Sequence, residues 1–170
     1  MAVAQDSIGT AVLIRQNGEE SLQVSGCATL PQGDEVNVHT NFRMASVSKQ
    51  FTAACIILLK NQGKLSYEGP LARFFPDFKT ARSIQLKHLL THTSGLRDYE
   101  SLLPADQSVQ VADADVVKWL SGADSTYFTP GTRYRYSNSG FCILSQVVEK
   151  VSGMPYARFV KEHILKPLAM

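Results

Sequence analysis

The hydrophobic pattern of the chain changes its period at Ser46, and this change limits the folds that the sequence can adopt. Before it, an apolar run over residues 8–16 is followed by Asn17-Gly18, a pair that is typical of a two-residue β-hairpin turn. After it, apolar residues recur at the spacing of one buried helix face: Phe51, Ala54, Cys55, Leu58 and Leu59. The sequence therefore predicts an antiparallel hairpin and then a long helix that ends at Gly63.

The rest of the chain predicts mostly helices. Residues 65–78 contain glycine and proline and are expected to form turns and irregular structure. Four helices are expected: one capped by Ser83 and stopped at Gly95, one capped by Asp113 and stopped at Gly122, one over residues 141–151 closed by Gly153, and one that starts at Pro155 and stops at Pro167. Because an isolated hairpin is only marginally stable in water, further strands are expected to cover it, so the chain looks unfinished at Met170.

The composition indicates one soluble globular domain, or a large part of one. Of 170 residues, 44% are hydrophobic and 19% are charged, and the net charge is +2 without a Lys/Arg block. Nucleic acid is therefore not a predicted partner. Neither a signal peptide nor an apolar stretch near the ~20 residues of a transmembrane segment is visible. Three scattered cysteines, Cys27, Cys55 and Cys142, predict buried thiols rather than disulfides or a zinc site.

Ser46 and Lys49 carry the first candidate chemistry. They are three residues apart at the start of the predicted long helix, so both side chains lie on one face. A serine hydroxyl is a poor nucleophile and needs an adjacent base, which the amine can supply. The free N–H groups at a helix start can also hold an oxyanion. Alone, the Ser-x-x-Lys spacing recurs by chance in many proteins and usually marks an ordinary solvated helix start.

A second polar cluster, Tyr136-Ser137-Asn138, lies far along the chain, before another apolar helix. It offers a phenol, and Asn138 can donate to a substrate carbonyl while it accepts from Lys49. Alone, the cluster is just as typical of a turn in which Ser137 or Asn138 caps a helix. The two clusters together favour acyl transfer through a covalent serine intermediate.

Several stretches resemble the serine β-lactamase and penicillin-recognising enzyme superfamily. Residues 42–53 look like its nucleophile segment. The Tyr-x-Asn order resembles the class C β-lactamase-like branch, which includes D-alanyl-D-alanine carboxypeptidases and esterases, whereas class A enzymes carry Ser-Asp-Asn. Further similar stretches are 89–96, 128–140, 148–153 and 166–170. In the last of them, Ala169 stands where the family usually has Gly.

The resemblance implies an α/β (α+β) fold of the β-lactamase/transpeptidase type, with an antiparallel sheet flanked by helices and a helical lobe. Residues 1–64 would form the hairpin and nucleophile helix of the α/β lobe, and residues 65–170 the mostly helical lobe with the Tyr-x-Asn motif. The family's Lys/His-Thr/Ser-Gly strand and its C-terminal strands do not occur in this chain, which is expected to be the N-terminal part only.

The same resemblance implies the roles of the site residues. Ser46 would be the acylated nucleophile and Lys49 its proton partner. Tyr136 would serve the leaving group and the deacylating water as acid and base. Asn138 would bind the substrate amide or hold Lys49.

The predicted function is a β-lactamase-related serine hydrolase that forms an acyl-enzyme with amides or esters: β-lactams, D-amino-acid peptides or small esters. No cofactor is expected. The alternatives are a non-catalytic penicillin-binding or sensing module, an inactive truncated fragment, and a small helical interaction protein. The expected partners are a small-molecule or peptide substrate, and a complementary C-terminal fragment or a second copy that covers the exposed sheet.

Two weaker signals remain. His88 and His92 are four residues apart, but no zincin glutamate lies between them and no third ligand is obvious. They are interpreted as hydrogen-bonded structural histidines. Residues 97–100 are interpreted as a solvated loop that could border the cleft.

Overall fold

The computed structural model describes residues 7–29, 33–103, 106 and 108–170. The chain divides into two compact units, residues 1–45 and residues 46–170. We call them the N-terminal unit and the helical unit, and describe each by itself. The division at residue 64 that the sequence suggested concerns the lobes of a complete family member, and it stays a prediction.

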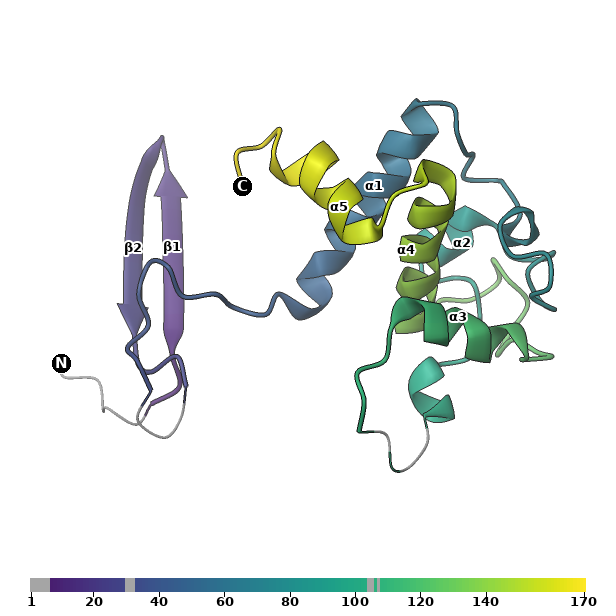
Figure 1. Cartoon of the computed structure of the whole chain (residues 1–170), viewed down its shortest axis with the longest axis horizontal. Helices are drawn as coiled ribbons and strands as arrows, with labels where there is room; N and C mark the ends of the chain where they lie inside the picture. Colours follow the sequence, from purple (N-terminus) through teal and green to yellow (C-terminus); the bar gives the residue numbers. More distant parts are fainter. Residues whose placement is uncertain (1–6, 30–32, 104–105, 107) are drawn as a thin grey trace. The chain divides into compact units, whose positions relative to one another are not determined.

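The N-terminal unit is built on a two-stranded antiparallel sheet, in which β1 (Thr10–Gln16) pairs with β2 (Glu19–Ser25) (Figure 1). Asn17 and Gly18 both have a positive φ, of 53° and 86°, as a type I′ turn requires. The predicted hairpin is therefore confirmed. Its apolar side chains remain largely open to solvent, since Leu13 is 61% exposed.

The helical unit gathers around α4. Its elements are η1 (Ala45–Ser48), α1 (Lys49–Asn61), η2 (Leu71–Arg73), α2 (Leu86–Leu90), η3 (Tyr99–Leu102), α3 (Asp113–Ser121), α4 (Asn138–Ser152), α5 (Tyr156–Val160) and η4 (Lys161–Leu165). The first residue of η1, Ala45, is the last residue of the N-terminal unit. Here η1, η2 and η3 are 3-10 turns and η4 is a π-helical turn. Helix α4 packs against α1, α2, α3 and α5 (Figure 1). None of the described helices combines the length and apolar character that crossing a membrane requires.

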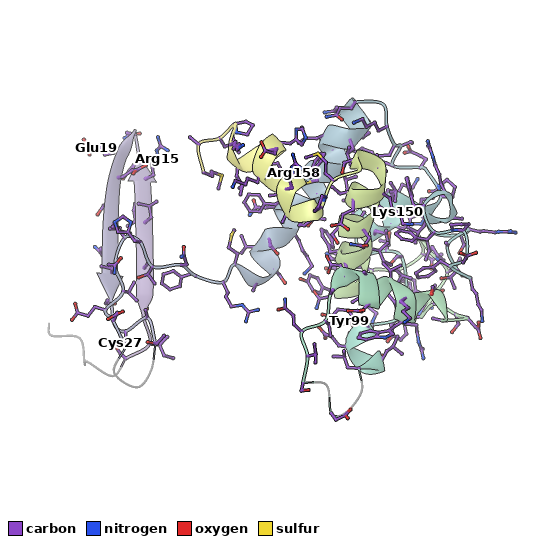
Figure 2. All side chains as sticks on the ribbon, viewed as in Figure 1. Arg15, Glu19, Cys27, Tyr99, Lys150 and Arg158 are labelled. Carbon is purple, nitrogen blue, oxygen red and sulfur yellow. The ribbon has the colours of Figure 1, made fainter. Side chains whose placement is uncertain are left out.

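The core of this unit explains why α1 and α4 lie together. Figure 2 shows side chains filling the space between the helices. The following are fully buried: Cys55, Ile56 and Leu59 from α1, Leu86 and Leu89 from α2, and Ile143, Leu144, Val147 and Val148 from α4. Burying one such aliphatic side chain contributes about 1.5–3 kcal/mol. This packing fixes the starts of α1 and α4, which carry the polar residues singled out above.

The helix starts differ from the sequence expectation in detail. The predicted start at Ser46 is right within one turn, but that turn is the 3-10 turn η1, and the α-helix begins at Lys49. Helix α4 begins three residues before the predicted residue 141, with Ser137 as its cap. The Ser137 hydroxyl accepts a hydrogen bond from the Gly140 N–H at 3.1 Å. Gly153 closes α4 with a φ of 71°, as predicted.

Two predicted caps are wrong. Ser83 does not cap α2, because its hydroxyl donates to the Thr80 carbonyl instead. The cap position is Gln85, whose N–H donates to His88 Nδ1 at 3.2 Å. Asp113 is the first residue of α3 rather than its cap. The hydrophobic period therefore located the helices better than the capping residues located their ends.

The last helical stretch begins at Tyr156, one residue later than predicted, with Pro155 as its cap, and it is not a regular helix to its end. It runs as α5 and then continues as η4 before Pro167.

We predict that replacing Gly153, at the left-handed end of α4, lowers stability, whereas replacing Gly122, just after α3, does not. Neither position is crowded, but Gly122 has a φ of −77° and Gly153 one of 71°. Gly153→Ala should lower the free energy of unfolding by about 1 kcal/mol, because a side chain disfavours that conformation. Gly122→Ala should leave it unchanged or slightly raised. Urea unfolding followed by circular dichroism compares the two, and equal stabilities would contradict the prediction.

Candidate active site

Ser46 lies in the 3-10 turn η1, directly before α1. In a 3-10 turn, residues three apart lie almost directly above one another. This geometry brings the Ser46 hydroxyl beside the side chain of Lys49, whose Nζ donates to Ser46 Oγ at 3.1 Å. The preceding Ala45 has a φ of 45°, which is uncommon for any residue other than glycine. Strained backbone of this kind clusters at functional sites.

The Tyr136-Ser137-Asn138 segment meets Ser46 and Lys49 at the start of α4. The Tyr136 hydroxyl donates to Ser46 Oγ at 2.6 Å. Lys49 Nζ donates to Asn138 Oδ1 at 2.8 Å and lies 4.9 Å from the centre of the Tyr136 ring. All four predicted site residues thus belong to one hydrogen-bonded network centred on Ser46 and Lys49. Ser46 and Tyr136 are exposed, so a substrate can reach them.

The electrostatics of this network act mainly on the phenol. The Lys49 amine beside it lowers the pKa of Tyr136 below its usual value, and the hydrogen bond to Ser46 lowers it further. A phenol with a lowered pKa gives up its proton more readily. It can then take the Ser46 proton and later return a proton to a leaving group.

The ring of His92 packs against the ring of Tyr136. Its ring lies 4.6 Å from the Tyr136 ring and 5.2 Å from the Phe141 ring, measured between centres. Its Nδ1 accepts the Ser137 N–H at 3.1 Å, and its carbonyl accepts the Arg135 N–H at 2.9 Å. These bonds agree with the interpretation of His92 as a hydrogen-bonded histidine. They also hold the backbone on both sides of Tyr136, a contact that sequence reasoning missed.

Glu100 is the second residue of the network that sequence reasoning missed. The Asn138 side chain donates from Nδ2 to Glu100 Oε1 at 2.9 Å while its Oδ1 accepts from Lys49. These two bonds fix which way the amide of Asn138 faces. No sequence pattern distinguished Glu100 from its neighbours in the loop over residues 97–100, so only the fold could reveal it.

His88 and His92, whose spacing resembles that of a metal-binding pair, are not joined by a third possible ligand within the described residues. Across residues 7–29, 33–103, 106 and 108–170, no group of three or more His, Cys, Asp or Glu side chains is placed to hold a metal ion. His88 Nδ1 accepts a backbone N–H, as described above, and the His92 Nδ1 is occupied in the same way.

The fold around this site is of the β-lactamase/transpeptidase type. The chain superposes on the crystal structure of a D-amino acid amidase from Ochrobactrum anthropi SV3 in complex with D-phenylalanine, with a TM-score of 0.84 and 29% identity. This match covers 96% of this chain and 46% of that one.

The chain belongs to the Beta-lactamase family, whose sequence model matches residues 2–170. The resemblance drawn from the sequence is thereby confirmed. Penicillin-binding protein 4* of Bacillus subtilis is 38% identical over 85% of this chain and 33% of its own length. Esterase EstB of Burkholderia gladioli is 29% identical over 96% of this chain and 46% of its own length. The chain therefore spans between a third and a half of these relatives.

The lowered pKa of Tyr136 predicts an early phase in a spectrophotometric titration of the tyrosines. Tyr136→Phe should remove tyrosinate absorbance that develops below pH 10, and Lys49→Met should shift this phase to higher pH. Tyr156→Phe is the matched control, because burial raises the pKa of Tyr156 and its loss should remove absorbance above pH 10. Identical titration curves for the two Tyr→Phe variants would contradict the prediction.

The environment of His92 predicts that stability falls as pH drops below about 6.5. Burial, and then the charge of Lys49, lower the pKa of His92 below its usual 6.5. The unfolded chain therefore binds more protons in this window, so unfolding becomes easier as pH falls. His88, whose pKa burial also lowers, contributes in the same direction.

Urea unfolding between pH 5.5 and 7 measures this dependence. His92→Asn should make the dependence of stability on pH shallower. Asparagine tolerates the positive φ of 57° at this position and keeps an acceptor for the Ser137 N–H. Lys49→Met should also make it shallower, because that charge contributes to the shift. An unchanged slope in both variants would refute the assignment.

Proposed function

We propose that the chain carries the nucleophile half of a serine hydrolase that cleaves amide or ester bonds through an acyl-Ser46 intermediate. The observation that supports this most is the pair of hydrogen bonds converging on Ser46 Oγ, one from the Tyr136 hydroxyl and one from Lys49 Nζ. A serine becomes a nucleophile only when a neighbouring group can take its proton. Here two such groups lie within hydrogen-bond distance of the same oxygen.

Acylation follows from these contacts. Ser46 Oγ attacks the carbonyl carbon of the substrate while its proton passes to the Tyr136–Lys49 pair. The oxyanion that forms can be held by the Ser46 N–H at the start of η1. Tyr136 then gives a proton to the departing nitrogen or oxygen, the carbonyl carbon–leaving group bond breaks, and an ester on Ser46 remains.

Deacylation reverses these roles. A water molecule attacks the ester carbonyl, and its proton passes to Tyr136. The bond to Ser46 Oγ breaks, Ser46 regains a proton from the pair, and the acid product leaves. The Tyr136 phenol thus serves as the acid for the leaving group and as the base for the water, which suits a group whose pKa is lowered.

The substrate class is proposed from the relatives. A penicillin-binding protein, an esterase and a D-amino acid amidase share the family or fold. We therefore propose β-lactams, D-amino-acid amides or peptides, and small esters as the candidate substrates. Asn138 would bind the acyl side of the substrate, because it lies on the Lys49 side of Ser46 and carries an amide with two N–H donors.

The decisive test is covalent labelling of the 170-residue chain with a fluorophosphonate and with a fluorescent penicillin. Mass spectrometry of the digested protein should locate the adduct on Ser46. Ser46→Ala should abolish it, whereas Ser48→Ala, in the same turn, should keep it. Tyr136→Phe and Lys49→Met should each slow labelling by about 10²–10⁴-fold, the usual contribution of an acid–base group.

Each outcome has one meaning. An adduct on another residue, or equal labelling of Ser46→Ala, would refute the proposal. Penicillin that stays bound to Ser46 without release would identify a penicillin-binding module that does not turn over.

A further inference from the structure

Glu100 is a carboxylate at the rim of the candidate site that the mechanism above does not use. We propose that it makes this site selective for substrates with a protonated amine on the acyl part, close to the bond that is cleaved. This inference rests on the proposed function and adds the chemistry of the substrate that the site would choose. The observation behind it is the hydrogen bond from Asn138 Nδ2 to Glu100 Oε1 at 2.9 Å.

The position of Glu100 relative to the reacting atoms indicates which part of a substrate it meets. The Tyr136 hydroxyl contacts Ser46 Oγ directly, and its acid role puts the leaving group on that side. The acyl part then extends the other way, past Lys49 and along Asn138. Glu100 accepts from the far nitrogen of Asn138, so it lies where groups on the atom next to the carbonyl would reach.

The chemistry of a carboxylate determines which substrate group binds at Glu100. An ionised carboxylate only accepts hydrogen bonds, whereas an ammonium has three donors and a positive charge. A free α-amino group in its charged form can therefore bind Glu100 directly. The carbonyl oxygen of an N-acylated amine is an acceptor and would face a like partial charge. Asn138 alone could bind that carbonyl, but one of its N–H groups is already given to Glu100.

Glu100 is held in this position by the start of α4. The Tyr99 N–H donates to Ser139 Oγ at 2.9 Å, and Ser139 Oγ donates to the Arg97 carbonyl at 2.9 Å. Tyr99 is marked in Figure 2. Ser139 follows Asn138 directly, so the loop and the amide it contacts move together. Glu100 is exposed, and the ion pairs within the described part of the chain do not include it.

The test compares two esters that differ only at the amine. The 170-residue chain is mixed with the p-nitrophenyl ester of D-phenylalanine or with its N-acetyl counterpart, and the burst of p-nitrophenolate measures acylation. At pH 6.5 most of the amine is protonated, since α-amino groups ordinarily titrate near about 7.7–8.0. The wild-type chain should acylate faster with the free-amine ester.

The variants isolate the carboxylate. Glu100→Gln should lower the ratio of the two acylation rates about fivefold, the upper end of what an exposed ion pair contributes. Glu100→Lys should lower it further. Glu162→Gln makes the same chemical change at an exposed helical pair with Lys166, and its ratio should equal that of the wild type. Adding 0.5 M NaCl should reduce the wild-type ratio, because salt screens exposed charges.

A ratio that does not change in Glu100→Gln and Glu100→Lys would overturn the inference, even if both rates fall, because Glu100 would then only orient Asn138. If that happens while fluorophosphonate still labels Ser46, the proposed function stands and only the inference fails. If neither ester nor fluorophosphonate modifies Ser46, both fail together.

Discussion

The packing of α4 against α1 is the contact on which the candidate site depends. Ser46 lies in η1, Lys49 begins α1, and Asn138 begins α4, far away in the sequence. Buried aliphatic side chains on both helices hold these starts together, and the Lys49–Asn138 hydrogen bond joins them at the polar end. Burying part of a charged amine is unfavourable unless it is hydrogen-bonded, and the Asn138 and Ser46 oxygens supply these bonds.

The same arrangement gives the site its electrostatic character. Two helix starts, each with the partial positive charge of a helix N-terminus, meet beside the Lys49 amine. Negative charge is stabilised there, whether it resides on the Tyr136 phenol or on a developing oxyanion. Burial, and then the charge of Lys49, lower the pKa of His92, whose Nδ1 must stay unprotonated to accept the Ser137 N–H. Glu100 places a carboxylate at the solvent-exposed rim of this positively charged site.

Patterns within one element could be read from the sequence. Among contacts between elements, the two polar clusters and the family resemblance anticipated the meeting of Lys49 with Asn138, but the other contacts of the site were not predicted. The hairpin turn, the buried faces of α1 and α4 and the glycine that ends α4 follow from local periodicity and backbone preferences. Ser83 and Asp113 were wrong as caps because Gln85 and Ala112 occupy those positions, their N–H groups satisfied by His88 and Asp115. Glu100 and the His92 stacking carry no local signal, because each depends on residues some forty positions away.

The hairpin poses a different physical problem from the site. Val12 is 44% exposed and Leu13 61%, and since neighbouring residues of a strand point to opposite faces, apolar side chains stand open on both faces of the sheet. Such strands are typical of sheets covered on both sides, and a lone hairpin is marginal. Cover by a complementary fragment or a second copy stays a prediction. All four predicted site residues, however, belong to the compact unit that begins at Ser46. Their geometry is therefore set by helix packing rather than by the sheet.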